Sequence, residues 1–299
     1  MTRQKIIDPG GLVKISSLSL RAKMIVEGVM SGIHASTYKG VSTEFSHHRE
    51  YSPGDELRFI DWRVYAKSDK YFIKQFVEDT TVRAHILLDV STSMNYPFAD
   101  TGNISKLEYA KTFAAAICYL LILQHDSVGL VTFDEKLREI IPVEAGLSHL
   151  HLIFKTLENI QAVHKTDINN SILEFGNFLK RRSLIIIISD FLANTDRVWS
   201  VLKYLAVRKH EVVLFHILDP SELSLEGQGE IEFQDIETKQ KRVVYIDDLR
   251  DSYSKVTADF ITFYRHHCQR IGIDYALFTC EMPFQESLSS YLIRRNKKR

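Results

Sequence analysis

Five short, almost continuous aliphatic runs constrain the fold more than any other feature of the sequence. They lie after residue 82 and cover residues 84–90, 127–133, 183–190, 211–218 and 273–279. Longer amphipathic stretches separate them, and this alternation predicts a doubly wound α/β fold with a mostly parallel sheet. Because each run is apolar on both faces, we expect strands that are covered by helices on both sides.

The amphipathic stretches have helical periodicity. They predict helices over Lys106–Gln124, Ser148–Asn159, Asn169–Lys180, Asp196–Lys209 and Leu249–Ile271. A hairpin of Glu230–Gln234 with Arg242–Tyr245 is expected after the fourth run. The first 80 residues contain one predicted helix, Ser19–Ser31, followed by charged and aromatic residues with frequent turn signals. The sequence therefore predicts a smaller β-rich region over residues 1–80 and an α/β domain over residues 81–299.

Composition limits the kinds of partner and location that we expect. Lys+Arg and Asp+Glu balance at 38 each, so no overall charge favours nucleic acid or an anionic membrane. The basic cluster at residues 294–299 is interpreted as a solvated end. The longest apolar run, residues 113–123, is about half of the roughly 20 residues that a membrane helix needs. With no signal peptide at its N-terminus, the chain is predicted to be cytoplasmic and without a membrane span.

An Asp-x-Ser-x-Ser string, formed by Asp89, Ser91 and Ser93, begins at the end of the first aliphatic run. The carboxyl ends of parallel strands meet at the sheet edge where ligands bind in open α/β folds. One carboxylate and two hydroxyls suit Mg²⁺ or Mn²⁺. Three donors are too few for an octahedral ion. Thr166, which precedes a predicted helix, and Asp190, which ends the third run, are therefore expected to complete the site.

Each of these donors also has a purely structural interpretation. Asp and Ser after a strand are common turn and helix-cap residues. Asp190 fits an N-cap for a following turn, and Thr166 with Asp167 fits a cap for the next helix. Under this interpretation the side chains only fix their loops, and Mg²⁺ has no effect on the protein.

The order and spacing of Asp89, Ser91, Ser93, Thr166 and Asp190 resemble the metal-ion-dependent adhesion site of the von Willebrand factor A domain. The resemblance implies a binding module and not an enzyme. It also implies that an acidic residue of a protein partner completes the coordination of the cation, so that metal availability controls association.

A second resemblance lies in residues 49–62. This box, which looks like the signature of the bacterial DUF58 family, contains Arg49, Tyr51, Gly54, Asp55, Arg58, Asp61 and Trp62. Members of that family are often associated with MoxR-type AAA+ ATPases, so the resemblance implies an adaptor or co-chaperone-like role beside such an ATPase. The box itself fits one of two roles. It is either a compact structural motif, held together by a turn and acid–arginine pairs, or a recognition surface.

The alternative from a different class is a Mg²⁺-dependent phosphoryl-transfer hydrolase that uses Asp89 as its nucleophile. Such an enzyme normally has a second carboxylate two residues later and a lysine that balances the phosphate charge. Ser91 occupies the position of that carboxylate. No GxxxxGK[ST] or GxGxxG string occurs, which disfavours nucleotide binding. The sequence therefore favours the binding module.

Overall fold

The computed structural model describes residues 8–35, 48–50, 64–65, 70–74, 81–97, 104–162, 167–225, 229–234 and 240–296. The chain divides into two compact units, Met1–Gly32 with Val82–Arg299, and Ile33–Thr81. In the smaller unit β1 (His48–Glu50) pairs antiparallel with β2 (Phe72–Lys74). Arg49 lies in β1, whereas the other box residues lie outside the described residues: Tyr51, Gly54, Asp55, Arg58, Asp61 and Trp62.

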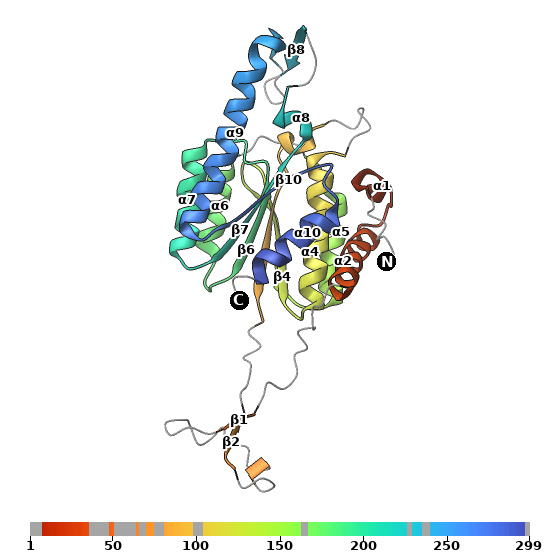
Figure 1. The fold of residues 1–299 in the computed structure, drawn as a ribbon, viewed down its shortest axis with the longest axis vertical. Helices are drawn as coiled ribbons and strands as arrows, with labels where there is room; N and C mark the ends of the chain where they lie inside the picture. The colour runs from red at the N-terminus through yellow and green to blue at the C-terminus, as the bar shows by residue number, and fades with distance from the viewer. Residues whose placement is uncertain are drawn as a thin grey trace. The chain divides into compact units, whose positions relative to one another are not determined.

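A six-stranded sheet in the order β10-β7-β6-β3-β4-β5 forms the centre of the larger unit (Figure 1). Its parallel strands coincide with the five aliphatic runs: β3 (Arg83–Asp89), β4 (Ser127–Phe133), β6 (Leu184–Ser189), β7 (Glu211–Leu218) and β10 (Asp274–Thr279). The remaining strand, β5 (Leu137–Glu144), pairs antiparallel with β4 at one edge. The predicted mostly parallel α/β fold is confirmed.

Helices cover both faces of this sheet (Figure 1). One layer contains α2 (Leu18–Ala35), α4 (Lys106–Leu123), α5 (Leu147–Asn159) and α10 (Phe284–Asn296). The other contains α6 (Ile168–Phe178), α7 (Thr195–Val207) and α9 (Ile246–Ile271). The short elements are α1 (Pro9–Val13), α8 (Pro220–Leu223) and the predicted hairpin, β8 (Glu230–Gln234) with β9 (Lys241–Tyr245). In the second layer, Ile172, Leu202 and Tyr264 pack on the sheet in one buried apolar cluster.

The N-terminal helices belong to the larger unit, which differs from the predicted division at residue 80. The guanidinium of Arg21 in α2 donates to Glu108 Oε1 at 2.6 Å and to Thr112 Oγ1 at 2.9 Å, both in α4. The backbone N–H of Leu18 donates to Glu158 Oε1 of α5 at 3.0 Å. These contacts attach α2 to the helix layer, so the smaller unit begins only at Ile33.

The unpredicted elements of the larger unit include β5 and α10. In β5, Arg138, Glu139 and Pro142 interrupt the apolar pattern, because much of this edge strand faces solvent. The second is α10, whose Arg294 guanidinium donates to the backbone carbonyl of Tyr275 in β10. The basic cluster therefore begins in the last turn of a packed helix, where Arg294 is still exposed, as the interpretation of a solvated end expects.

The sheet reverses its direction of winding between β3 and β6. From β3 the chain proceeds outward through β4 and β5, and it then returns to β6 on the other side of β3. At such a switch point the connections from neighbouring strands leave in opposite directions, and ligands bind outside the carboxyl ends of those strands. Asp89 ends β3 and Asp190 follows β6. The two predicted acidic donors therefore flank the switch point.

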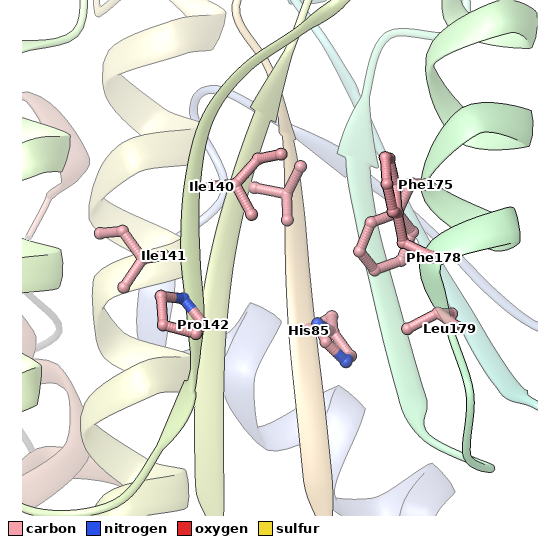
Figure 2. A pocket seen from close by; sticks show the side chains of 8 residues that line it. His85, Ile140, Ile141, Pro142, Phe175, Phe178 and Leu179 are labelled. Carbon is pink, nitrogen blue, oxygen red and sulfur yellow. The ribbon is translucent and has the colours of Figure 1, made fainter.

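An apolar pocket of about 230 Å³ lies elsewhere on the sheet, between β5 and α6 (Figure 2). Ile140 and Pro142 line it from β5, and Phe175 and Phe178 line it from α6. His85 of β3 also lines it and precedes Asp89 by four residues, which places the pocket roughly 13 Å back along the strand. The pocket is therefore separate from the carboxyl edge.

Candidate functional site

The loop after β3 gathers the three donors of the Asp-x-Ser-x-Ser string. Asp89 is fully buried, and its Oδ1 accepts a hydrogen bond from the backbone N–H of Ser91 at 2.9 Å. Its Oδ2 accepts from the hydroxyl of Ser189 in β6 at 2.6 Å. A single turn of 3₁₀ helix, Thr92–Asn95, then brings Ser93 Oγ to 3.1 Å from Ser91 Oγ.

Asp190 lies beside this loop. Its Oδ1 accepts from the backbone N–H of Leu192 at 3.2 Å, as the turn-capping interpretation expects, and the side chain of Ser93 lies next to its carboxylate. Hydrogen bonds therefore join Asp89, Ser91 and Ser93, and the carboxylate of Asp190 lies beside Ser93. The structure brings these four predicted donors together at one sheet edge, and their binding of a metal stays a prediction.

Thr166 lies outside the described residues, so its part in the site also stays a prediction. Its neighbour Asp167 is the N-cap of α6, where Oδ1 accepts from the backbone N–H of Asn170 at 3.2 Å. The capping interpretation therefore holds for Asp167.

Lys106 is a member of the site that the sequence reasoning missed. It is the first residue of α4, and its side chain is fully buried. Its Nζ lies 2.8 Å from Asp190 Oδ2 and 2.6 Å from Glu222 Oε1. The other carboxylate oxygen of Glu222 accepts from the backbone N–H of Asp219 at 2.8 Å. The backbone N–H of Lys106 donates to the carbonyl of Tyr96 at 2.9 Å. Lys106 therefore joins the loops that follow β3, β6 and β7.

The position of Lys106 in its helix is unusual. The N-terminus of a helix carries partial positive charge, which disfavours a cation in the first turn. Burial of a charge is a further cost unless it is paired. A lysine that opens the largely apolar helix Leu107–Leu123 is therefore the sequence signal for a buried ion pair. The signal for Glu222 is weaker, because Glu222 also completes the capping box of α8 with Asp219.

The pKa values of the acidic groups differ sharply. Burial, with the negative charge of Asp190 nearby, raises the pKa of Asp89 from 3.8 to about 7. Burial opposes ionisation of Asp190 as well, but Lys106 outweighs it and holds the pKa of Asp190 below its usual value. Burial also raises the pKa of Glu222. Burial opposes the charge on Lys106, but Asp190 and Glu222 together raise the pKa of its ammonium.

The residues fit a divalent cation in both charge and donor type. Asp89, Asp190 and Glu222 carry three negative charges when ionised, and Lys106 offsets one of them, which leaves an excess of two among these four groups. In the described part of the chain, no group of three or more His, Cys, Asp or Glu side chains is arranged as a metal site. A cation here would therefore depend on the hydroxyls of Ser91 and Ser93, which suit Mg²⁺ or Mn²⁺.

The family model described as "Protein of unknown function DUF58" matches residues 47–260, more than half of the chain. The chain belongs to the DUF58 family. The DUF58 match includes all five predicted donors, and it also includes Lys106 and Glu222.

The chain is also similar to relatives and to solved structures. "Uncharacterized protein Rv1480" of Mycobacterium tuberculosis is 29% identical over 263 residues, which are 86% of this chain and 81% of that protein. A von Willebrand factor type A structure from Catenulispora acidiphila aligns at 13% identity and a TM-score of 0.34, over 46% of this chain and 34% of that one. An aerotolerance-related membrane protein from Bacteroides fragilis aligns at 16% identity and a TM-score of 0.47, over 73% and 100%. At these identities the structures are similar in fold alone.

The prediction of a cytoplasmic location is wrong by this comparison. The Bacteroides fragilis structure comes from a protein described as a membrane protein, and a similar structure from Vibrio fischeri comes from one described as membrane spanning. The prediction rested on the lack of a long apolar run, and that lack does not fix a location. Among the described residues, no helix combines the length and apolar character needed to cross a bilayer.

Proposed function

We propose that this DUF58 protein is a metal-dependent protein-binding module. Mg²⁺ or Mn²⁺ would be held by Asp89, Ser91, Ser93 and Asp190, with Thr166 as the fifth donor expected from the sequence. The observation that carries the proposal is the excess of two negative charges, which Asp89, Asp190, Glu222 and Lys106 have when all are ionised, beside two hydroxyls at the switch point of the sheet. A divalent cation matches that excess and that donor set.

The proposed partner contributes an acidic side chain, because a bound divalent ion supplies a Lewis-acidic position for an oxygen anion. Ser93 is partly exposed, whereas Asp89 and Ser91 are buried, so the partner would approach from the side of Ser93. Ser189 and the backbone of Ser91 orient Asp89, and Lys106 orients Asp190. A MoxR-type AAA+ ATPase, or its client, is the partner that the family resemblance suggests, with this chain as adaptor or co-chaperone.

Thermal unfolding with and without the metal tests the proposal. A ligand that binds only the native state stabilises it by RT ln(1 + [L]/Kd). We expect millimolar Mg²⁺ or Mn²⁺ to raise the Tm of the wild type and to leave that of Asp89→Ala unchanged. The matched control is Asp196→Ala, an exposed aspartate at the start of α7, which should respond as the wild type does. A wild-type Tm that is indifferent to both ions at neutral pH contradicts the proposal.

The partner is tested with purified proteins. A MoxR-type ATPase from the same host is passed over immobilised wild type and immobilised Asp89→Ala, in Mg²⁺ or in EDTA. The proposal expects retention by the wild type in Mg²⁺ alone. Equal retention in all four conditions would contradict metal control of this association.

One observation favours a phosphoryl-transfer hydrolase as the second candidate. Lys106 is a cation beside Asp190, which is the kind of group that such an enzyme uses to balance phosphate. We nevertheless propose binding and not catalysis, because both oxygens of Asp89 accept hydrogen bonds and its side chain is fully buried. Turnover of p-nitrophenyl phosphate by the wild type, lost in both Asp89→Asn and Lys106→Met, would reverse this preference.

A further inference from the structure

We propose that Lys106 is a tethered cation, which fills a second cation position formed by Asp190 and Glu222 beside the site of Asp89, Ser91 and Ser93. Lys106 would thereby limit the site to one divalent ion and keep Asp190 in place for it. The first-ion part of this inference rests on the proposed function. The existence of the second position does not.

The geometry of the two carboxylates supports a cation position. Asp190 follows β6 and Glu222 lies in α8, so two separate segments of the chain contribute one carboxylate oxygen each. These oxygens lie 2.8 Å and 2.6 Å from Lys106 Nζ. Asp190 is buried and Glu222 is partly buried, and two ionised carboxylates this close repel one another unless a cation lies between them. Calcium–oxygen distances are about 2.3–2.6 Å, so only small shifts would let the same two oxygens bind a Ca²⁺- or Mn²⁺-sized ion in the absence of the ammonium.

The chemistry of Lys106 points to a role beyond stability. When both partners of a buried ion pair are replaced by apolar side chains of similar volume, the protein often loses no stability. Lys106 is buried and also lies in the first turn of α4, where the helix dipole opposes its charge. Burial and the helix dipole therefore both oppose the charge of its ammonium, whereas the carboxylates of Asp190 and Glu222 need a positive charge at this position.

The decisive experiment counts bound Mn²⁺ ions per chain, by calorimetric titration or by the electron paramagnetic resonance signal of free Mn²⁺. We expect one ion for the wild type and two for Lys106→Met, because methionine replaces the lysine chain only as far as Cε and leaves the ammonium position between Asp190 and Glu222 free for an ion. The double variant Lys106→Met with Glu222→Gln should return to one. The matched control is Lys111→Met on the same helix, a largely buried lysine paired with Glu108 at 3.2 Å, which should keep the wild-type count.

The possible outcomes separate the two proposals. A folded Lys106→Met variant that binds no more ions than the wild type overturns the tethered cation. A wild type that binds none, with a Lys106→Met variant that binds one, supports the tethered cation and contradicts the proposed metal-dependent function. A gain that Glu222→Gln does not remove also overturns the inference, because the extra ion would then lie elsewhere.

Chemical rescue provides a second measurement should Lys106→Met fail to fold. Lys106→Ala removes the atoms equivalent to propylammonium and leaves a cavity beside Asp190 and Glu222. Propylammonium should raise the Tm of Lys106→Ala by several degrees more than equimolar 1-propanol does, and it should leave the wild type unaffected. Equal effects of the charged and the neutral compound would overturn the inference, because filling of space would then explain the stabilisation.

Discussion

The ammonium nitrogen of Lys106 lies 2.8 Å from Asp190 Oδ2, and neither side chain is more than 1% exposed. This ion pair joins the first turn of α4 to the residue that follows β6. It therefore crosses the switch point of the sheet, on which the candidate site is built. Several properties of the protein should depend on it and on the groups around it.

Removal of the ammonium should strongly destabilise the metal-free protein. In Lys106→Met, Asp190 and Glu222 lose their common partner while Asp190 stays buried, and loss of one member of a buried pair costs about 3–5 kcal/mol. Urea unfolding in EDTA measures the change. Adding Glu222→Gln to this variant should recover part of the loss, because one unpaired charge is removed. A cost below about 1 kcal/mol would show that the pair is not held as described.

The stability of the metal-free protein should fall as pH rises through the window set by Asp89. Its pKa is about 7 in the folded state, against an ordinary value of 3.8. Between these values the folded state retains a proton that the unfolded state has released, so the free energy of unfolding decreases with pH and then levels off. Asp89→Asn should remove this contribution, whereas the exposed Asp196→Asn should not.

The measurement is urea unfolding in EDTA at several pH values between 4 and 8. Parallel curves for the wild type and Asp89→Asn would contradict the assignment of the raised pKa. Because a divalent ion binds the ionised form, Mg²⁺ should stabilise the wild type more at pH 8 than at pH 5.

The attachment of α2 to the larger unit should depend on Arg21. Arg21→Met keeps the aliphatic packing but removes the hydrogen bonds to Glu108 and Thr112, and bonds to charged groups are worth about 1.5–3 kcal/mol. The matched control on the same helix is Lys23→Met, which breaks an exposed pair with Glu27 and should change stability by less than about 0.5 kcal/mol. Equal effects of the two substitutions in urea unfolding would contradict this packing.

Two glycine-to-alanine substitutions should change stability in opposite directions. A Cβ on Gly129 in β4 would lie 2.7 Å from the backbone oxygen of Ile141 in the paired strand, so Gly129→Ala should cost about 1–3 kcal/mol. A Cβ on Gly28 in α2 would meet Gln285 Cγ at an ordinary 3.6 Å, so Gly28→Ala should gain up to about 1 kcal/mol from helix propensity. Thermal unfolding distinguishes the signs, and a stabilising Gly129→Ala would contradict the described pairing of β4 with β5.

The sequence predicts the central part of the fold because strands buried on both faces need continuous apolar runs. All five such runs are parallel strands, and the amphipathic stretches between them supply α4, α5, α6, α7 and α9. An edge strand such as β5 lacks that requirement, since Glu139 is exposed to solvent and Arg138 pairs with Asp134. The packing of α2 on α4 could not be predicted from the sequence either, because Arg21 and Glu108, which form the contact, are 87 residues apart.

The candidate site could be predicted only where its residues follow a strand. Asp89 and Asp190 each follow a buried run, and parallel strands bring their carboxyl ends to one edge. Lys106 reaches this edge of the sheet from the start of α4, after the loop that follows β3. Glu222 lies more than 100 residues further along the chain. No local pattern connects those two residues, so their pairing emerges only in three dimensions.

The irregular sequence of β5 has a consequence for how copies of this chain behave together. β5 lies at the edge of the sheet, where a regular strand could accept a strand from another molecule. Pro142 has no N–H to donate to such a neighbour, and the exposed Glu139 would carry charge into the junction. Both features therefore disfavour the addition of a strand from another copy of the chain on this side of the sheet.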